Sequence, residues 1–509
     1  MIRHLLAASF LAQLFALAAT VATRLLLTGL LIRAWGPAQF ADWVVIVSMV
    51  TFIGLPDSCL QVFFGNMFHR CYATKDLAGL NRWVGIALLY YLVIYSAVVL
   101  VAVGAVLLMD LASVFNLRSN GSAVITAIVG LLVLDRCLYS FRGPLNQLYR
   151  ATGEVARQIN SGTLLSVTVA VVVGAGVLAG AMPDTAAVLM VGATISVGLI
   201  GMVVNLKRRL PWLLLRPVTP TKEERSRILA TVRLFAVDQT GPMLLNELPT
   251  VLLAGAATDP RLIVLFVTTR MVVNLVRQVQ ASAAVSLGIQ LADYAYARNQ
   301  AAVRQTLVDG IGIVALGTAV LASLIAAHAG NLLAVWTGRN DLFDPFVFMA
   351  LLLAVVMSAP TMVLAMGLTY TNQPAPTALA RIIHLTLFVL GAVIAYRTDF
   401  FYGVVIALAT AEIIAQTIVL PMAARGTEFR LSLTDYAKVY GRALGAFTLI
   451  YVAGALIEEL YPLAAWPVLL AKATVTGLIA LAVGYALLSE WERRQIWSVL
   501  KAFGERWKS

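Results

Sequence analysis

Several arginines lie inside long apolar runs, where a charged side chain needs water or a partner. Arg270, Asn274 and Arg277 recur at the i, i+4, i+7 spacing that places side chains on one face of a helix. Arg24 lies in a separate apolar run. A charge at mid-bilayer costs roughly 2.5–3.5 kcal/mol and usually faces a cavity or an ion partner. Because guanidinium groups match phosphate oxygens, these positions could bind a phosphate-bearing ligand.

Two acids, Asp57 and Glu247, lie in further apolar runs and could share a site with the arginines. At 1.5 Å per helical residue, Arg24, Glu247 and Arg270 lie at a similar depth, roughly 12–15 Å below the outer surface. The alternative is structural, with Glu247 neutralising Arg24 or Arg270. The sequence leaves both interpretations open.

A second set of polar residues could hold a coupling ion. Asp238 and Asn246 lie in the seventh apolar run, and Thr410 and Glu412 lie in the twelfth. Oxygen ligands suit a hard cation such as sodium, and an intramembrane carboxylate can also relay protons. The alternative is that both acids are buried and hydrogen-bonded. His384 could titrate near neutral pH, but a lone histidine inside a membrane span is more often a packing residue. No cofactor and no resident metal are expected, so the only ion predicted is a coupling H⁺ or Na⁺.

The elements that must position these residues are membrane helices. Of the 509 residues, 61% are hydrophobic and 12% charged, compared with about 45–50% and about 25% in soluble proteins. This composition excludes a soluble or disordered chain. Fourteen runs are long enough to cross a bilayer, which predicts an all-α polytopic membrane protein. They are 5–33, 40–66, 82–109, 122–141, 159–181, 185–205, 229–255, 260–290, 306–336, 345–370, 376–396, 400–423, 436–457 and 464–488.

The distribution of basic residues predicts the orientation. With the N-terminus inside, 26 of the 37 Lys and Arg lie at the inner loops, termini and adjoining span ends, and five lie outside. The positive-inside rule therefore places both termini in the cytoplasm. The same loops account for the net charge of +12 without a nucleic-acid partner.

The longest polar connection divides the chain into two similar halves. It falls between the sixth and seventh spans, and Pro37 and Pro260 mark equivalent short outer turns. We expect two six-helix lobes related by a pseudo-two-fold axis along the membrane normal, followed by two extra helices. The predicted parts are an N-terminal lobe at 1–206, a basic linker at 207–228, a C-terminal lobe at 229–424, the extra helices at 425–488 and an amphipathic inner-leaflet tail at 489–509.

The turn after the first span carries a family resemblance. Segment 31–43 reads Leu-Ile-Arg-Ala-Trp-Gly-Pro-Ala-Gln-Phe-Ala-Asp-Trp, and segment 54–57 reads Gly-Leu-Pro-Asp. This pattern resembles the polysaccharide transporter family, which includes Wzx-type flippases within the multidrug/oligosaccharidyl-lipid/polysaccharide exporter superfamily. Trp35 stands where the family has Leu, Ala41 where it has Gly, and Ser58 where Leu-Gly is usual.

The resemblance implies a substrate site and a function. In that family, spans one, two, seven and eight line a central cavity. The implied substrate-binding residues here are Arg24, Asp57, Glu247, Arg270, Asn274 and Arg277. We expect a flippase that moves a polyprenyl-diphosphate-linked oligosaccharide to the outer leaflet by ion-coupled alternating access. The expected location is the bacterial inner membrane, and the polysaccharide polymerase machinery is a candidate partner beside membrane lipids.

Two other classes of protein remain open. A multidrug or small-cation exporter of the same superfamily would have a cavity dominated by carboxylates and aromatics, which the arginines disfavour. A membrane enzyme acting on lipid-linked sugars would need acid–base or metal ligands at an outer loop. The paired outer acids, Asp341 with Asp344 and Glu458 with Glu459, fit solvated turns better. We therefore do not expect an enzyme.

Overall fold

The computed structural model describes most of the chain. It describes residues 2–490 and 492–494, except 118, 120, 257, 258, 372, 398, 399 and 462–464. Within the described helices, the side chains of 2–14, 17, 73, 106, 107, 231, 233–239, 256, 286, 289 and 293 are not described. The predicted amphipathic tail at 489–509 therefore lies largely outside the described residues.

Every regular element among the described residues is helical. In chain order the elements are α1 (Ile2–Thr51), η1 (Phe52–Gly54), α2 (Leu55–Ala73), α3 (Leu77–Leu108), α4 (Leu111–Val114), α5 (Ser122–Ala151), α6 (Val155–Leu178), α7 (Pro183–Ala193), η2 (Thr194–Gly201), α8 (Met202–Arg209), α9 (Lys222–Ala256), α10 (Pro260–Tyr296), α11 (Gln300–Ala327), α12 (Ala329–Thr337), η3 (Asn340–Leu342), α13 (Pro345–Tyr370), α14 (Ala375–Ala395), α15 (Phe400–Ile414), η4 (Ala415–Val419), α16 (Leu420–Ala423), η5 (Ala424–Gly426), α17 (Leu433–Leu460) and α18 (Trp466–Leu487).

The helices account for the predicted membrane spans. Twelve helical runs among the described residues are long and apolar enough to cross a membrane. The first, Ala18–Tyr72, includes residues 18–33 of the first predicted span and all of the second. Helix α9 covers the seventh predicted span although it is not one of the twelve. The prediction of an all-α protein with about fourteen membrane helices is confirmed.

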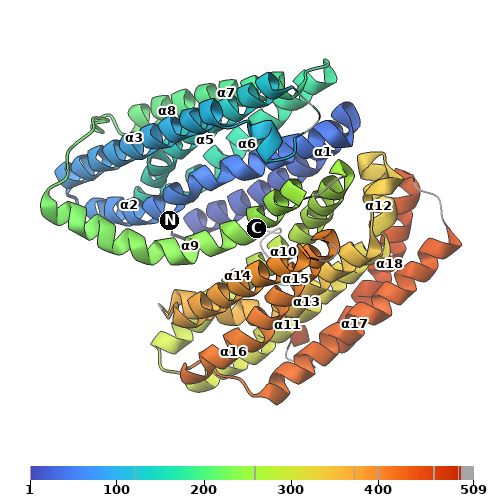
Figure 1. Ribbon diagram of the computed structural model, residues 1–509. Coiled ribbons are helices and arrows are strands. Elements are labelled where there is room, and N and C mark those ends of the chain that lie inside the picture. The colour runs from blue at the N-terminus through green and yellow to red at the C-terminus, as the bar shows by residue number, and fades with distance from the viewer. Residues whose placement is uncertain are drawn as a thin grey trace. The chain divides into compact units, whose positions relative to one another are not determined.

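The chain packs as two compact units, drawn from blue to green and from green to red in Figure 1. Unit 1 comprises Met1–Val264 and unit 2 comprises Leu265–Ser509. Helix α9 packs against α1 and α2 within unit 1. The C-terminal lobe predicted from the repeat begins at residue 229 and so includes the apolar part of α9. Packing places α9 in unit 1 instead.

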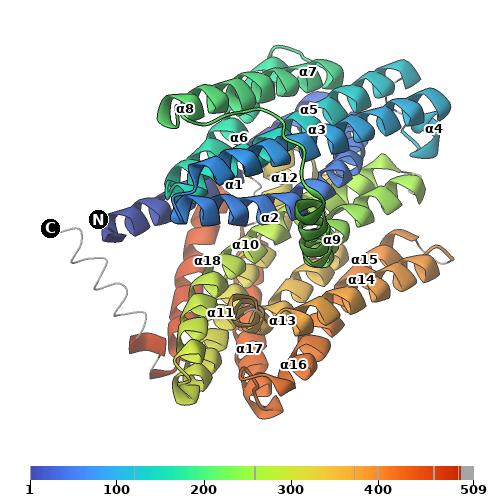
Figure 2. The same cartoon turned by 90° about the vertical axis from the view of Figure 1, so that its left-hand side faces the viewer.

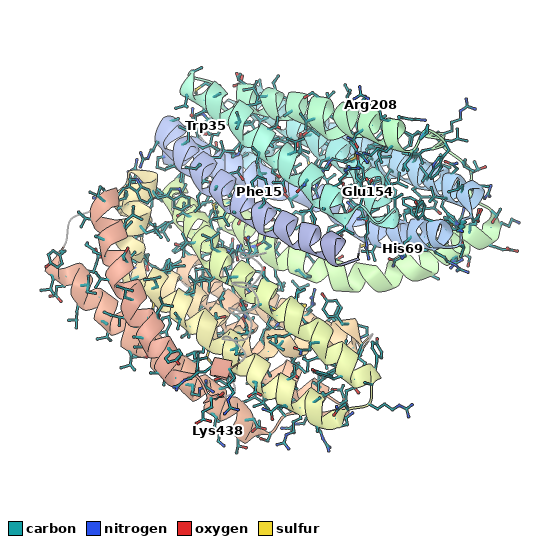
Figure 3. The ribbon with its side chains drawn as sticks, turned by 180° about the vertical axis from the view of Figure 1, so that it is seen from behind. Phe15, Trp35, His69, Glu154, Arg208 and Lys438 are labelled. Carbon is teal, nitrogen blue, oxygen red and sulfur yellow. The ribbon has the colours of Figure 1, made fainter. Side chains whose placement is uncertain are left out.

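A sharp bend separates the first two spans. Gly36 has φ 76° and ψ 170°, a left-handed φ that favours glycine, and Pro37 follows it. The indole of Trp35 donates a hydrogen bond to the carbonyl of Ala181 at 2.9 Å and packs edge-on against Trp43. In Figure 3, Trp35 lies at the opposite end of unit 1 from Glu154. The predicted turn is thus anchored to the loop before α7.

The two units share an unusual local feature. The sixth and twelfth spans each contain a π-helical segment, η2 and η4. In unit 1, Thr194 of η2 donates to Asp135 at 2.6 Å, and in unit 2, Thr361 donates to Gln416 of η4 at 3.5 Å. A π-helical segment widens a helix locally. In each unit the wider segment is contacted by a polar side chain of a neighbouring span, Asp135 of the fourth span in unit 1 and Thr361 of the tenth span in unit 2. This correspondence agrees with an internal repeat.

The basic linker between α8 and α9 runs past α3 (Figure 2). Its backbone bonds to the N-terminal part of α3, where the amide of Val218 donates to the carbonyl of Gly85 at 3.0 Å. Arg82 donates two hydrogen bonds to Glu224, at 2.8 and 2.9 Å. These bonds hold the pKa of Glu224 well below its usual range, at about 2. The linker is therefore fastened to unit 1.

Candidate functional site

The best-defined charged contact inside unit 2 joins α10 to α15. The Arg277 guanidinium donates two hydrogen bonds to the two carboxylate oxygens of Glu412, at 2.5 and 2.9 Å. The Glu412 side chain is 8% exposed and the Arg277 side chain 37%. The sequence assigned Arg277 to substrate binding and Glu412 to ion coupling, so the structure brings together residues from two separately predicted sites.

Other polar side chains surround this ion pair. Arg270 lies two turns before Arg277 on α10, with its guanidinium 5.2 Å from the centre of the Phe266 ring. Both Arg270 and His384 are close enough to Glu412 to interact with it electrostatically. His384 is buried, and its Nε2 has no hydrogen-bond partner among the described atoms. Unit 2 therefore contains a cluster of cations around the carboxylate of Glu412.

The sequence also predicts two other residues of unit 2, Asn274 for substrate binding and Thr410 for ion coupling. Asn274 lies on α10 between the two arginines and is half-buried. The hydroxyl of Thr410 is directed back to its own helix and donates to the carbonyl of Ile406 at 2.7 Å. Its predicted role in ion binding stays a prediction.

Arg24 is exposed at mid-span on α1 of unit 1. It lies roughly 14 Å from Arg33, near the end of that span. On α9, Glu247 accepts a hydrogen bond from Asn246 at 2.7 Å. The side chain of Asp238, a predicted ion ligand, lies outside the described residues. Unit 1 thus presents an exposed guanidinium in the middle of an apolar helix.

Asp57 belongs to a buried network inside unit 1. It is 3% exposed, and it accepts hydrogen bonds from Tyr91 at 2.6 Å and from Gln61 at 2.8 Å. The network is close-packed because α5 presents Gly143 to it, and a Cβ at that position would collide with the Gln61 amide. Arg136 is near enough to interact electrostatically. The carboxylate therefore links α2 to α3, and its contact with a substrate stays a prediction.

A further buried cluster near α12, α17 and α18 was not anticipated. Glu458 accepts hydrogen bonds from Lys472 at 2.8 Å and from Asn331, and lies 2.6 Å from His328 Nδ1. The other His328 nitrogen lies 3.0 Å from the Thr476 hydroxyl. The interpretation of Glu458 as a solvated turn acid is therefore wrong. Sequence reasoning missed it because His328 and Asn331, at the start of α12, lie about 130 positions before Glu458 in the sequence.

The described side chains contain no group of three or more His, Cys, Asp or Glu that could hold a metal ion. The cysteines Cys59, Cys71 and Cys137 are free thiols and buried.

Comparisons with solved structures identify the fold of the chain. No family model and no curated protein matches the sequence. Among solved structures, the chain is similar to the lipid II flippase MurJ in an inward closed conformation, with a TM-score of 0.72 and 12% identity over 96% of this chain and 99% of that one. It is also similar to an inward-facing multidrug resistance MATE family transporter of the MOP superfamily, with a TM-score of 0.65 and 15% identity over 79% and 93%.

A third likeness is to a MOP superfamily transporter from Pyrococcus furiosus, with a TM-score of 0.51 and 14% identity over 79% of this chain and 94% of that one. At these identities the likenesses establish the fold. The chain is a multi-pass membrane protein with the fold of MOP superfamily transporters.

Proposed function

We propose that the protein is a flippase for a polyprenyl-diphosphate-linked oligosaccharide. It moves the sugar and diphosphate from the cytoplasmic to the outer leaflet of a bacterial inner membrane, for cell-surface or exopolysaccharide assembly. The polyprenyl tail stays in lipid. The polysaccharide polymerase machinery would be the partner that receives the product.

The observation that carries this proposal is the exposed guanidinium of Arg24 in the middle of an apolar helix. Facing lipid at that depth, it would cost roughly 2.5–3.5 kcal/mol on insertion scales. A water-filled path that accepts an anion removes this cost and uses the charge. A diphosphate is the anion that suits a planar guanidinium best, because two oxygens accept from it at once.

The cations of unit 2 support the same chemistry. Arg270 lies at a comparable depth on α10. In the cluster of Arg270, Arg277 and Glu412, two cations surround one carboxylate, so the formal charge is positive with His384 neutral. A small organic cation would be repelled there, which disfavours the drug-exporter alternative.

The extent of the structural likeness also supports a lipid substrate. The match to the lipid II flippase leaves out 4% of the chain, about twenty residues, so it includes most of α17 and α18. The match to the multidrug transporter covers 79% of the chain. The more extensive match to the flippase supports a lipid-linked substrate over a drug.

Coupling to an ion is part of the proposal. Glu412 would take up H⁺ or Na⁺ in unit 2, where Thr410 lies on the same helix. Asp238 and Asn246 of α9 are further candidates for ion coupling in unit 1. Neutralising the Glu412 carboxylate would release Arg277 from its bidentate pair. That change would leave a guanidinium available to a diphosphate, which would couple the ion to the substrate.

Translocation in proteoliposomes tests the function. A fluorescent polyprenyl-diphosphate oligosaccharide is placed in one leaflet, and its arrival in the other is followed with a membrane-impermeant quencher. We expect protein-dependent translocation and no efflux of a small organic cation. Efflux of the cation without lipid translocation would move the protein to the drug-exporter class.

A further inference from the structure

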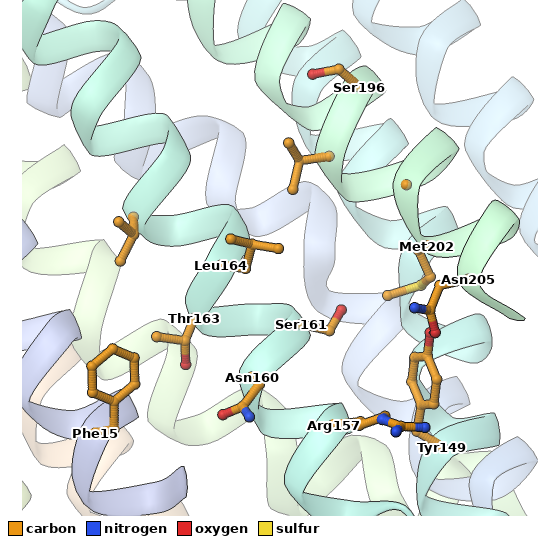
Figure 4. Close-up of a pocket in the computed structure, with 13 residues that line it drawn as sticks. Phe15, Tyr149, Arg157, Asn160, Ser161, Thr163, Leu164, Ser196, Met202 and Asn205 are labelled. Atoms are coloured by element: carbon orange, nitrogen blue, oxygen red, sulfur yellow. The ribbon is translucent and has the colours of Figure 1, made fainter.

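A cavity of about 710 Å³ opens in unit 1 among α1, α5, α6, η2 and α8 (Figure 4). This volume is within the range of ligand pockets, roughly 300–1,000 Å³. All of its lining residues belong to unit 1. None of them is among the residues proposed for substrate binding or ion coupling, so the cavity needs an explanation of its own.

The cavity has a polar part and an apolar part. Tyr149, Arg157 and Asn205 gather at one corner, whereas Phe15 and Leu164 lie across from them (Figure 4). Phe15 is 65% exposed and Leu164 is 60% exposed. Apolar side chains this open on a membrane helix contact lipid, so the apolar part is accessible to an acyl chain.

Arg157 lines the polar part, and the residues around it carry an excess of positive charge. Glu154 accepts hydrogen bonds from Arg157 at 2.8 Å and from Arg209 at 3.1 Å, so one carboxylate serves two guanidinium groups. Lys207 and Arg208 precede Arg209 at the same end of α8. The positive-inside rule predicts that this end is cytoplasmic.

A buried arginine lies directly behind the cavity wall. Arg142 is 4% exposed and donates a hydrogen bond at 2.9 Å to Ser161, which lines the cavity. The described ionisable groups that act on it are the phenols of Tyr139 and Tyr149, and its Nε has no hydrogen-bond partner among the described atoms. A buried cation without a carboxylate favours an anion nearby.

The shape of the helix that forms one wall makes room for this cavity. Ser196, Val197 and Gly201 lie in the π-helical segment η2, whose wider turn alters the path of the helix beside α6. Gly201 adds no side chain, and Ser196 bonds back to its own helix, to the carbonyl of Gly192 at 2.8 Å. Part of the cavity wall is thus formed by a π-helical segment.

We propose that this cavity binds one anionic phospholipid of the cytoplasmic leaflet. The phosphate lies beside Arg157 and Ser161, and one acyl chain follows Leu164 and Phe15. Basic pockets between membrane helices on the cytoplasmic side are suited to anionic headgroups. Such a lipid would brace α6 against η2, and it would do so whether or not the proposed flippase function holds.

Equilibrium lipid binding to the purified, delipidated full-length protein tests this proposal. Phosphatidylglycerol and phosphatidylcholine with identical chains serve as probes. Both lipids carry the phosphate, but the choline cation of phosphatidylcholine would be repelled by the arginines around the polar part. We therefore expect phosphatidylglycerol to bind at least about tenfold more tightly. Arg157→Gln should remove most of this preference. Filling the cavity with Ser196→Phe should weaken the binding of both lipids.

Arg208→Gln is the matched control, because it removes the same charge from the same end of unit 1 without lining the cavity. Thermal unfolding of each variant verifies folding. Equal binding of the two lipids would overturn the proposal. So would equal effects of Arg157→Gln and Arg208→Gln, since diffuse surface charge would then explain the preference. Competition by inorganic phosphate alone, with no dependence on the acyl chain, would also contradict it.

Discussion

The ion pair between Arg277 and Glu412 gives a prediction whose size can be worked out. Replacing Arg277 by Gln leaves a carboxylate that is 8% exposed without its bidentate partner. The simplest relief is for Glu412 to bind a proton. At pH 7, protonating a carboxyl with the usual glutamate pKa of about 4.3 costs about 3.7 kcal/mol. This is within the range of about 3–5 kcal/mol for breaking a buried pair.

Replacing the other member of the pair, Glu412, should cost less stability than replacing Arg277. Glu412→Gln leaves the Arg277 guanidinium, whose side chain is 37% exposed and can be hydrated, so we expect a loss of about 1–3 kcal/mol. The double variant should recover more than half of the Arg277→Gln loss, because the buried carboxylate that lost its bidentate partner is no longer present. The matched control is Arg339→Gln, which breaks the open Arg339–Asp341 pair and should cost at most about 1 kcal/mol.

Thermal unfolding in a mild detergent measures these differences. About 2–4 °C per kcal/mol in a domain of this size gives a decrease of roughly 7–15 °C for Arg277→Gln at pH 7. The decrease should shrink on acidification, by about 1.4 kcal/mol per pH unit, because the proton becomes easier to supply. Equal losses for the two single variants, with no dependence on pH and no recovery in the double variant, would refute this reasoning.

Two other predictions concern unit 1. Gly143→Ala should destabilise the protein by about 1–3 kcal/mol, because the new methyl group would push apart the Gln61 amide and the buried Asp57 carboxylate, which share a hydrogen bond. Gly130→Ala on the same helix meets open space and should be neutral or slightly stabilising; thermal unfolding of both variants checks this. Glu224→Gln should lower the unfolding temperature above pH 4.5. The pKa of Glu224 is lower in the folded protein, so its stabilising contact with Arg82 is lost as pH falls from 4.5 towards 2, and the deficit should vanish there; a deficit that grows on acidification would contradict the assignment.

The membrane helices could be predicted from the sequence because length and apolarity alone identify them. The bend at Gly36 was also readable, since Pro37 follows it between two apolar runs. The partners of the charged residues could not be predicted. Arg277 and Glu412 lie 135 positions apart, and their meeting depends on how α10 and α15 rotate against each other. Helices that are apolar on nearly every side give no periodic signal for that rotation.

The same limitation explains the other differences. The π-helical segments η2 and η4 have no simple sequence signature, so the cavity beside η2 could not be predicted. The repeat suggested a division before α9, but packing against α1 and α2 places this helix in unit 1. The depth of Arg24 followed from counting residues along the helix, and its exposure required the structure.

The central claim is that an exposed guanidinium at mid-span receives the diphosphate of a lipid-linked sugar. The most direct test is the translocation rate of a polyprenyl-diphosphate oligosaccharide by the wild type, Arg24→Gln and Arg33→Gln. The two variants make the same substitution in the same helix, at mid-span and near its end. We predict that Arg24→Gln lowers the rate at least about tenfold, the effect of one lost charge-assisted hydrogen bond, and that Arg33→Gln leaves it nearly unchanged. Undiminished translocation by a folded Arg24→Gln protein would contradict the account.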